Sequence, residues 1–227
     1  MHFHLPKPLH GWREFAGEVG IIVLGVLIAL GAQQIAESIH QHDEVRQTRK
    51  ALNAELAHNL AAFDDRLSMG PCAQRQLDEV GTILDREAKG SVALRRDFEP
   101  PLSINLQFAV WDAASGEARS MIPLEPKLQY AQLYDIFRRY DRFRDEEVED
   151  WAKLADLDFE GHLSAQDVKQ ARVTVKRLLR LDKLLPAYAS FLQRSARPLG
   201  IRPEPDIDAP AQELMTKNRA TLCSPMI

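Results

Sequence analysis

The most apolar part of the chain lies near its beginning. Residues 19–32 include no charged side chain, and extending the segment back to Phe15 adds only one charge, Glu18. Eighteen helical residues span about 27 Å, which is close to the roughly 30 Å hydrocarbon core of a bilayer. The pattern therefore predicts a transmembrane helix over residues 15–35, after an N-terminal arm of residues 1–14.

A cleaved signal peptide and a buried helix of a soluble protein are two other interpretations of this segment. Glu14 and Glu18 stand where a signal peptide needs net positive charge, which argues against cleavage. No other segment is apolar enough to surround a helix that is hydrophobic on all sides, which argues against burial. Positive charges on the two sides of the predicted membrane helix are nearly equal in number, so they do not decide which end of the helix faces the cytoplasm.

Small side chains recur along one face of the predicted membrane helix, at Gly25, Ala29, Ala32 and Ala36. Such a face lets another membrane helix approach closely. It indicates association with a second copy of the chain or packing on another membrane protein. The other interpretation is that glycine and alanine are common in any membrane helix.

A narrow apolar stripe follows the membrane segment, within an arc of about 80° on a helix of about 100° per residue. Its members are Val45, Leu52, Leu56, Leu60, Phe63 and Leu67. Because nothing between Gln33 and Ser68 breaks the pattern, we expect the membrane helix to continue into the domain. Gly70 and Pro71 then predict the end of this helix and the start of a second one over residues 72–89.

The pattern changes in the middle of the chain. Within residues 91–106 two prolines break any helix and the apolar residues after them alternate, which predicts an extended segment. A short helix is expected over residues 107–118. A strong helical pattern then follows Pro126 and is expected to continue to Leu157.

The last part of the chain is predicted to form one more helix, which begins after Ser164, and a C-terminal tail. Ser164 and Asp167 form a capping pair for the helix. Five prolines within residues 197–227 indicate an irregular, proline-rich C-terminal tail. The chain is therefore predicted to be all-α, with a transmembrane helix that continues into a soluble bundle of four or more helices over residues 36–196.

Composition narrows the class of protein. The 227 residues are 45% hydrophobic and 27% charged, with a formal net charge of -4. These values describe an ordinary folded protein and exclude a disordered polymer, a collagen and a disulfide-dense toxin. A slightly acidic chain without blocks of like charge also argues against nucleic acid as the principal partner.

Two Glu-x-x-His pairs, Glu37 with His40 and Glu55 with His58, match the half-site pattern of di-iron carboxylate proteins. The pairs lie on one helix at a separation of about 27 Å, so they cannot share a metal within one chain. Their histidines also project away from the apolar stripe. We therefore expect both pairs to belong to a solvated polar face.

Residues 156–167 resemble an EF-hand calcium loop, with oxygen-bearing side chains at ligand positions and Gly161 at the turn position. The fit is incomplete, because Glu160 is long for its position and Asp167 is too short for easy bidentate ligation. The chain has no second loop to pair with it. We interpret these residues as an interhelical turn capped by Ser164, and we expect no bound metal or other cofactor.

Aromatic residues and arginines alternate through residues 134–144, a pattern that can stack on single-stranded nucleic acid. Acidic residues follow at once within residues 145–150, so a core stripe with a charged outer face accounts for the pattern. The chain has no nucleophile elbow, no glycine-rich phosphate loop and no cysteine with a plausible histidine partner. We accordingly predict that the protein is not an enzyme.

The two cysteines, Cys72 and Cys223, lie in no metal-binding or Cys-x-x-Cys spacing. A disulfide between them would fasten the tail, which has few large apolar residues, to the second predicted helix. Two free thiols are the alternative, and they are expected if the domain faces the reducing cytoplasm.

The segment from Gly17 to Leu30, GEVGIIVLGVLIAL, resembles the N-terminal signature of a family of uncharacterised bacterial single-pass membrane proteins. In that family Gly-Glu-Ile or Gly-Glu-Val opens a glycine-interrupted apolar helix. Weaker similarity continues at residues 111–116, WDAASG, and around residues 130–134. The resemblance implies a bacterial inner-membrane anchor with a periplasmic domain. Because the family has no assigned function, it implies no catalytic residue.

These features favour an interaction module that is anchored in the lipid bilayer and associates with itself or with another envelope protein. Such a module is expected to present a broad uncharged surface patch and no enclosed polar pocket. The alternative is a ligand-binding or sensory helical domain that acts through a partner membrane protein, because helical bundles often bind small molecules between their helices.

Overall fold

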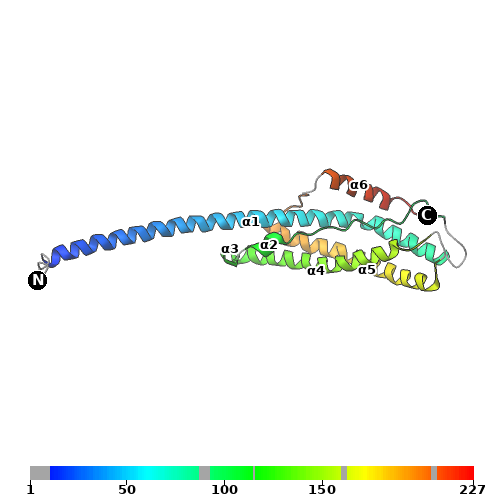
Figure 1. Cartoon of the computed structure of the whole chain (residues 1–227), viewed down its shortest axis with the longest axis horizontal. Helices are drawn as coiled ribbons and strands as arrows, with labels where there is room; N and C mark the ends of the chain where they lie inside the picture. The colour runs from blue at the N-terminus through cyan, green and yellow to red at the C-terminus, as the bar shows by residue number, and fades with distance from the viewer. Residues whose placement is uncertain (1–10, 87–92, 115, 160–162, 206–208) are drawn as a thin grey trace, which may run out of the picture.

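The computed structural model of the chain is built from helices. It describes residues 11–86, 93–114, 116–159, 163–205 and 209–227. No strand occurs within these ranges, and the all-α prediction is confirmed. One very long helix carries the bundle on its C-terminal part and extends alone beyond the bundle at its N-terminal end (Figure 1).

Helix α1, Trp12–Arg86, has 75 residues and is therefore about 110 Å long. It contains the apolar segment and continues from it into the bundle without a break. The apolar stripe faces the interior of the bundle, where Leu52, Leu56 and Phe63 are at most 1% exposed. A single helical element thus connects the apolar segment to the core.

The predicted helix end at Gly70 and Pro71 is wrong, because α1 continues through both residues. Pro71 removes one backbone hydrogen bond, but it lies on the exposed side of the helix, where water can reach the freed carbonyl group. Residues of α1 are buried on both sides of the proline, from Phe63 before it to Leu77 after it. Packing on the rest of the bundle therefore maintains the helix where the local sequence disfavours it.

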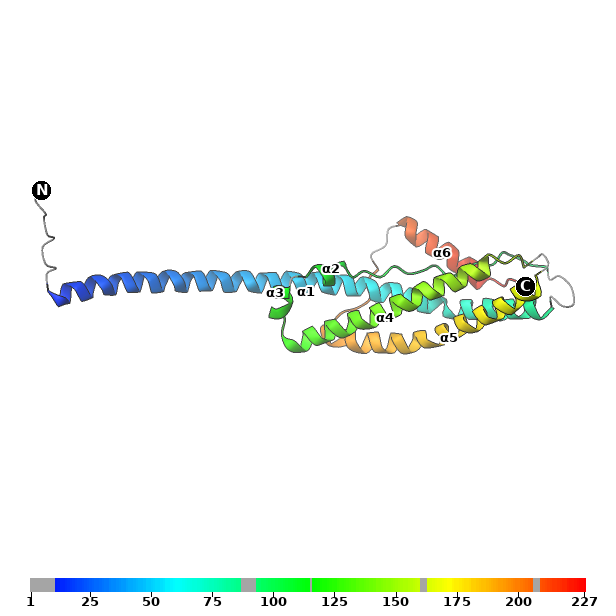
Figure 2. The same ribbon diagram turned by 60° about the horizontal axis from the view of Figure 1, so that its bottom comes forward.

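An extended segment and two short helices follow α1. The extended segment, residues 93–108, runs along α1 (Figure 2). It leads into α2, Ala109–Ala113, and α3, Gly116–Met121. The single helix predicted over residues 107–118 is therefore divided into two, since Ala114 has a non-helical backbone conformation.

Two long helices, α4, Leu124–Ala155, and α5, Ala165–Ala196, form a hairpin that packs along α1. The predicted cap of α5 is present. Ser164 Oγ accepts a hydrogen bond from the Asp167 N–H, and the Asp167 carboxylate accepts one from the Ser164 N–H. The Ser164 hydroxyl, followed by the Ser164 N–H, lowers the pKa of the Asp167 carboxyl below its ordinary value.

The core consists of two hydrophobic clusters along the bundle. The first surrounds Phe137 of α4 and also includes Ile201 from the C-terminal part of the chain. The second surrounds Leu77 of α1 and includes Met226, close to the C-terminus. Residues after α5 therefore complete both clusters.

The prediction of an irregular tail is wrong in part. A 3-10 turn, η2, Arg197–Leu199, and a helix, α6, Ala209–Cys223, form within it. Pro210 is tolerated in the first turn of α6 because N–H groups there have no helical partner. α6 packs on α1, on the side away from α4 and α5 (Figure 1).

Candidate functional site

The apolar segment of α1 is exposed along its whole length in the monomer. Every residue from position 15 to position 40 is exposed, including Ile21 at 74% and Leu27 at 60%. Within the described part of the chain, this is the one helix that is long and apolar enough to cross a membrane. Its small residues form a face about 150° around the helix from the stripe that the bundle buries. These residues are Gly25, Ala29, Ala32 and Ala36.

Cys72 of α1 and Cys223 at the end of α6 form a disulfide. Arg219 of α6 supports the same junction, donating hydrogen bonds to Asp65 at 3.2 Å and to Ser68 at 2.7 Å. The N-terminal half of α6 has no buried residue. The C-terminal end of α6 is therefore the end that is fixed to α1.

Side-chain amides of α1 hold the extended segment, residues 93–108, in place. The Asn59 amide donates to the Gln107 carbonyl at 2.7 Å and accepts from the Gln107 N–H at 2.8 Å. Further along α1, the Gln76 amide donates to the Glu99 carbonyl at 2.8 Å and accepts from the Glu99 N–H at 3.2 Å. Each amide satisfies the backbone groups that an extended chain would otherwise pair with a neighbouring strand.

A third amide reaches the extended segment from α6. Asn218 accepts a hydrogen bond from the Leu102 N–H at 3.2 Å and donates to the Pro100 carbonyl at 2.9 Å. Asn218 is only 4% exposed, so these bonds are shielded from solvent. The extended segment is thus fixed by α1 on one side and by α6 on another.

Glu55 is not on a solvated face, which corrects the prediction for the second Glu-x-x-His pair. It is 4% exposed, and its carboxylate accepts hydrogen bonds from the Val110 N–H at 2.7 Å and the Tyr134 hydroxyl at 2.6 Å. His58 is partly buried, whereas His40 of the first pair is exposed. The start of α2 and the aromatic side of α4 cover this part of α1. Burial, followed by the hydrogen bond to Glu55, raises the pKa of Tyr134.

A buried ion cluster lies near the middle of α1. The Arg66 side chain is 3% exposed. Its Nε and Nη2 both donate hydrogen bonds to the carboxylate of Glu147 in α4, the Nε at 3.0 Å. Nη2 also lies 3.5 Å from the carboxylate of Asp182 in α5. Burial alone lowers the pKa of Arg66, but Glu147, together with Tyr140 and Asp182, more than offsets this, so the pKa lies above its ordinary value. Gly70 leaves room for the cluster, since a Cβ there would lie 3.3 Å from an Asp182 oxygen.

A cleft of about 290 Å³, here called the Arg66 cleft, lies between the extended segment and α4 beside this cluster. Its apolar lining is formed by Pro100, Pro101, Leu102, Ile104, Val148, Trp151 and Ala152. Its polar lining includes Glu99, Ser103, Glu147 and Asn218. Arg66, Tyr140 and Arg144 also line it. Each of these three has a buried polar atom without a partner among the described residues, namely Arg66 Nη1, Tyr140 Oη and Arg144 Nε.

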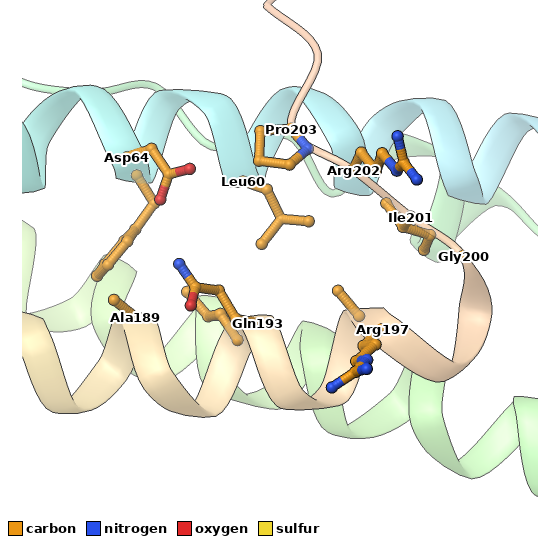
Figure 3. A pocket seen from close by; sticks show the side chains of 12 residues that line it. Leu60, Asp64, Ala189, Gln193, Arg197, Gly200, Ile201, Arg202 and Pro203 are labelled. Carbon is orange, nitrogen blue, oxygen red and sulfur yellow. The ribbon is translucent and has the colours of Figure 1, made fainter.

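A second cleft of about 290 Å³ lies between α1, α5 and the segment that follows η2 (Figure 3). Leu60 and Asp64 line it from α1, and Gln193 lines it from α5. Burial, followed by the charge of Asp65, raises the pKa of Asp64. None of its lining residues has a buried side-chain polar atom without a partner, which distinguishes it from the Arg66 cleft.

The outer side of α5 presents a continuous exposed face, here called the α5 outer face. Its eight residues fall within an arc of about 80° on the helix. They are Lys169, Val173, Lys176, Arg180, Leu184, Ala187, Phe191 and Arg194, and all are exposed. Four are cations and none is acidic, so this face differs from the uncharged patch expected from the sequence. The acidic residues of α5, Asp167 and Asp182, are engaged at the cap and in the ion cluster.

The EF-hand-like loop lies partly outside the described residues, because positions 160–162 are among those not described. Its described ends are the cap residues of the flanking helices. Asp156 is the C-cap of α4 and Ser164 is the N-cap of α5. Within the described ranges, no group of three or more His, Cys, Asp or Glu side chains is placed to hold a metal ion.

Three of the four aromatic residues of the arginine-rich segment belong to the core, as expected, and the fourth, Phe143, is partly buried. Tyr134, Phe137 and Tyr140 are at most 3% exposed. Rings that are buried in this way have no free face on which a nucleic-acid base can stack.

Sequence reasoning missed the polar residues that organise this region. Asn59, Gln76 and Arg66 are buried, at 0%, 1% and 3% exposed. Each lies three or four residues from apolar positions of α1 on both sides, and that is the signal that could have identified them. A polar side chain on a buried stripe has to find a partner.

No protein-family model matches this chain, and comparison with curated proteins and with solved structures finds no match either.

Proposed function

We propose that this chain is a non-enzymatic interaction module, held in the bacterial inner membrane by one helix and placed in the periplasm. Its partner is a second copy of the chain or another envelope protein. The single observation that carries this proposal is the α5 outer face, which no described part of the chain covers.

The evidence for a membrane anchor is the exposed apolar segment of α1. A helix of about 18 apolar residues with no protein neighbour needs a lipid environment, because water disfavours contact with so much apolar surface. The resemblance of residues 17–30 to bacterial single-pass anchors supports the inner membrane. The disulfide between Cys72 and Cys223 supports the periplasm, since disulfides persist in oxidising compartments.

The α5 outer face has the composition of a contact surface. Val173, Leu184 and Phe191 are 46%, 43% and 51% exposed, and cations lie among them along the helix. Arg194 lies over the Phe191 ring, with its guanidinium carbon 4.7 Å from the ring centroid. Phenylalanine and arginine are enriched at protein interfaces, and arginine is frequent among the residues that dominate the binding energy.

The small-residue face of the apolar segment and the α5 outer face can be in contact with different partners at the same time. The small-residue face of the apolar segment points away from the side of α1 that carries α4 and α5. Two copies that pair through Gly25 and Ala36 therefore keep their α5 outer faces on the outside. Such a pair could hold a further partner on each copy.

Site-specific photo-crosslinking in native membranes tests this proposal. A photoreactive amino acid at Leu184 is expected to yield a discrete adduct of higher mass, whereas one at Gln132, an exposed position of α4, is expected to yield none. A second, differently tagged copy tells self-association from association with another protein. Charge reversal by Arg180→Glu should abolish the adduct. Equal crosslinking at both positions, or none at Leu184, would contradict the proposal.

A further inference from the structure

The α5 outer face, on which the proposed function rests, also indicates the chemistry of its partner. We infer that this face binds an acidic amphipathic helix of a different protein, which lies lengthwise along α5. Three features support this: cations without an acidic neighbour, the spacing of the residues of the face, and the direction of α5 in the molecule.

The cations of α5 fall into two groups. Beside the outer face, Arg172 pairs with Asp85 of α1 at 2.7 Å and Arg177 pairs with Asp150 of α4 at 2.8 Å. The cations of the face itself form no ion pair within the described part of the chain, and neither does the exposed lysine at its edge. These five residues are Lys169, Lys176, Arg180, Arg194 and, at the edge, Lys183. Acidic groups of this chain thus neutralise the sides of α5 but not its outer face.

The unpaired cations lie close enough to repel one another. Arg180 is four residues after Lys176 and three before Lys183, and like charges at these spacings destabilise a helix. The whole chain has a formal net charge of -4, so the face is opposite in sign to the rest of the molecule. A surface that carries carboxylates relieves the repulsion and complements the face in charge.

The spacing of the face fits a second helix. Its eight residues, from Lys169 to Arg194, follow one another at intervals of three or four, so they stay in line over about 37 Å of α5. Side chains at such intervals are those that one helix presents to another helix lying along it. In helical projection the large apolar residues Val173, Leu184 and Phe191 lie along one side of the face, and the cations lie along the other. The complementary helix therefore has an apolar stripe next to an acidic one.

The direction of α5 argues against the lipid surface as the partner. α5 runs alongside α1 (Figures 1 and 2). With α1 crossing the bilayer as proposed, α5 stands upright on the membrane. A flat anionic surface then reaches one end of the face at most, whereas an upright helix of another protein reaches its full length.

A second copy of the chain lacks the complementary surface. The exposed sides of its other long helices each carry both signs of charge. On α4, Asp135, Glu146 and Glu149 are accompanied by Arg138, Arg139 and Arg142, and on α6, Glu213 is accompanied by Lys217 and Arg219. On α1, Asp78 is accompanied by Arg75. We therefore assign the acidic helix to a different protein.

Zero-length crosslinking of the full-length protein in native membranes tests the inference. A carbodiimide joins a lysine amine to a carboxylate in contact with it, forming an amide and releasing a urea. We expect adducts of higher mass through Lys169, Lys176 or Lys183. Mass spectrometry of the linked peptides is expected to place the carboxylate in another protein, in a segment whose acidic and large apolar residues both recur at intervals of three or four.

Matched lysine variants control for the location of the contact. Replacing Lys169, Lys176 and Lys183 together by glutamine should abolish the adduct, while Lys217→Gln, at an exposed position of α6, should leave it unchanged. Raising the salt concentration from about 0.05 to 0.5 M should reduce the yield several-fold, because salt screens charges at a surface.

The inference is overturned if no carboxylate is linked to these three lysines, if the linked carboxylate belongs to a second copy of the chain, or if its segment lacks the stated spacing. A photo-crosslink at Leu184 without a carbodiimide adduct overturns this inference alone. Absence of the Leu184 photo-crosslink contradicts the proposed function itself, so the two failures can be told apart.

Discussion

Asn59 of α1 and Gln107 of the extended segment are joined by two hydrogen bonds, one in each direction. The same arrangement recurs between Gln76 and Glu99. Between these points the extended segment borders the Arg66 cleft. α1 therefore organises a non-helical part of the domain with side chains alone.

Replacing Asn59 tests how much this attachment contributes to folding. Asn59→Ala removes both bonds and leaves the Gln107 N–H and carbonyl without that partner. We expect it to lower the free energy of unfolding by about 1–3 kcal/mol, measured by urea denaturation. Asn105→Ala changes an exposed residue of the same segment and should have little effect. Equal effects of the two variants would contradict the proposed attachment.

The Cys72–Cys223 disulfide closes a loop of 151 residues, which by chain entropy is worth about 5 kcal/mol as an upper figure. We expect mass spectrometry of a non-reduced digest to find the two cysteine peptides linked. Reduction, or Cys223→Ser, should lower the melting temperature and loosen α6. Free, alkylatable thiols in protein taken from its native compartment would contradict both the bridge and the periplasmic location.

The cap of α5 predicts a dependence of stability on pH. The Ser164 hydrogen bonds give the Asp167 carboxyl a lower pKa in the folded state than its ordinary value of 3.8. The cap therefore adds stability above that pH, and the contribution is lost as the pH falls through the folded pKa. Ser164→Ala should lower the melting temperature at pH 7, and the difference from the wild type should shrink in acid below about pH 3.8.

Gln166→Ala, one position before Asp167, is the matched control for this experiment. Gln166 is exposed and in the first turn of α5, but it takes no part in the capping box. A constant difference between Ser164→Ala and the wild type at every pH would contradict the role assigned to the carboxylate.

Periodicity was sufficient to predict the helical class, the buried stripe of α1 and the cap at Ser164. It failed at Pro71, where local preference favours a break but buried residues on both sides keep the helix continuous. Packing between distant segments decides such cases, and one sequence does not reveal it. The helix α6 was missed for the same reason, since its position depends on Cys223 and Asn218.

The Arg66 cleft was beyond sequence reasoning because its residues come from distant parts of the chain. Arg66 belongs to α1, Ile104 to the extended segment and Arg144 to α4. Glu55 illustrates the same limit, since a helical projection places it beside the stripe but does not indicate that α2 and α4 cover it.

Calcium provides a negative prediction. Added calcium should leave the melting temperature of the protein unchanged, because residues 156–167 are interpreted as a capped turn. Occupancy at a hundred times the dissociation constant would add about 2.7 kcal/mol, which a thermal melt detects easily. A clear upward shift with calcium that disappears in Asp156→Ala would contradict this interpretation.

Alkaline carbonate extraction of native membranes tests whether α1 anchors the protein in the bilayer. We expect the chain to stay in the membrane fraction at full length, with its N-terminus intact, because residues 15–35 remain in the bilayer. Recovery of a soluble mature chain that begins near Gln33 would contradict it and would identify the apolar segment as a cleaved signal peptide.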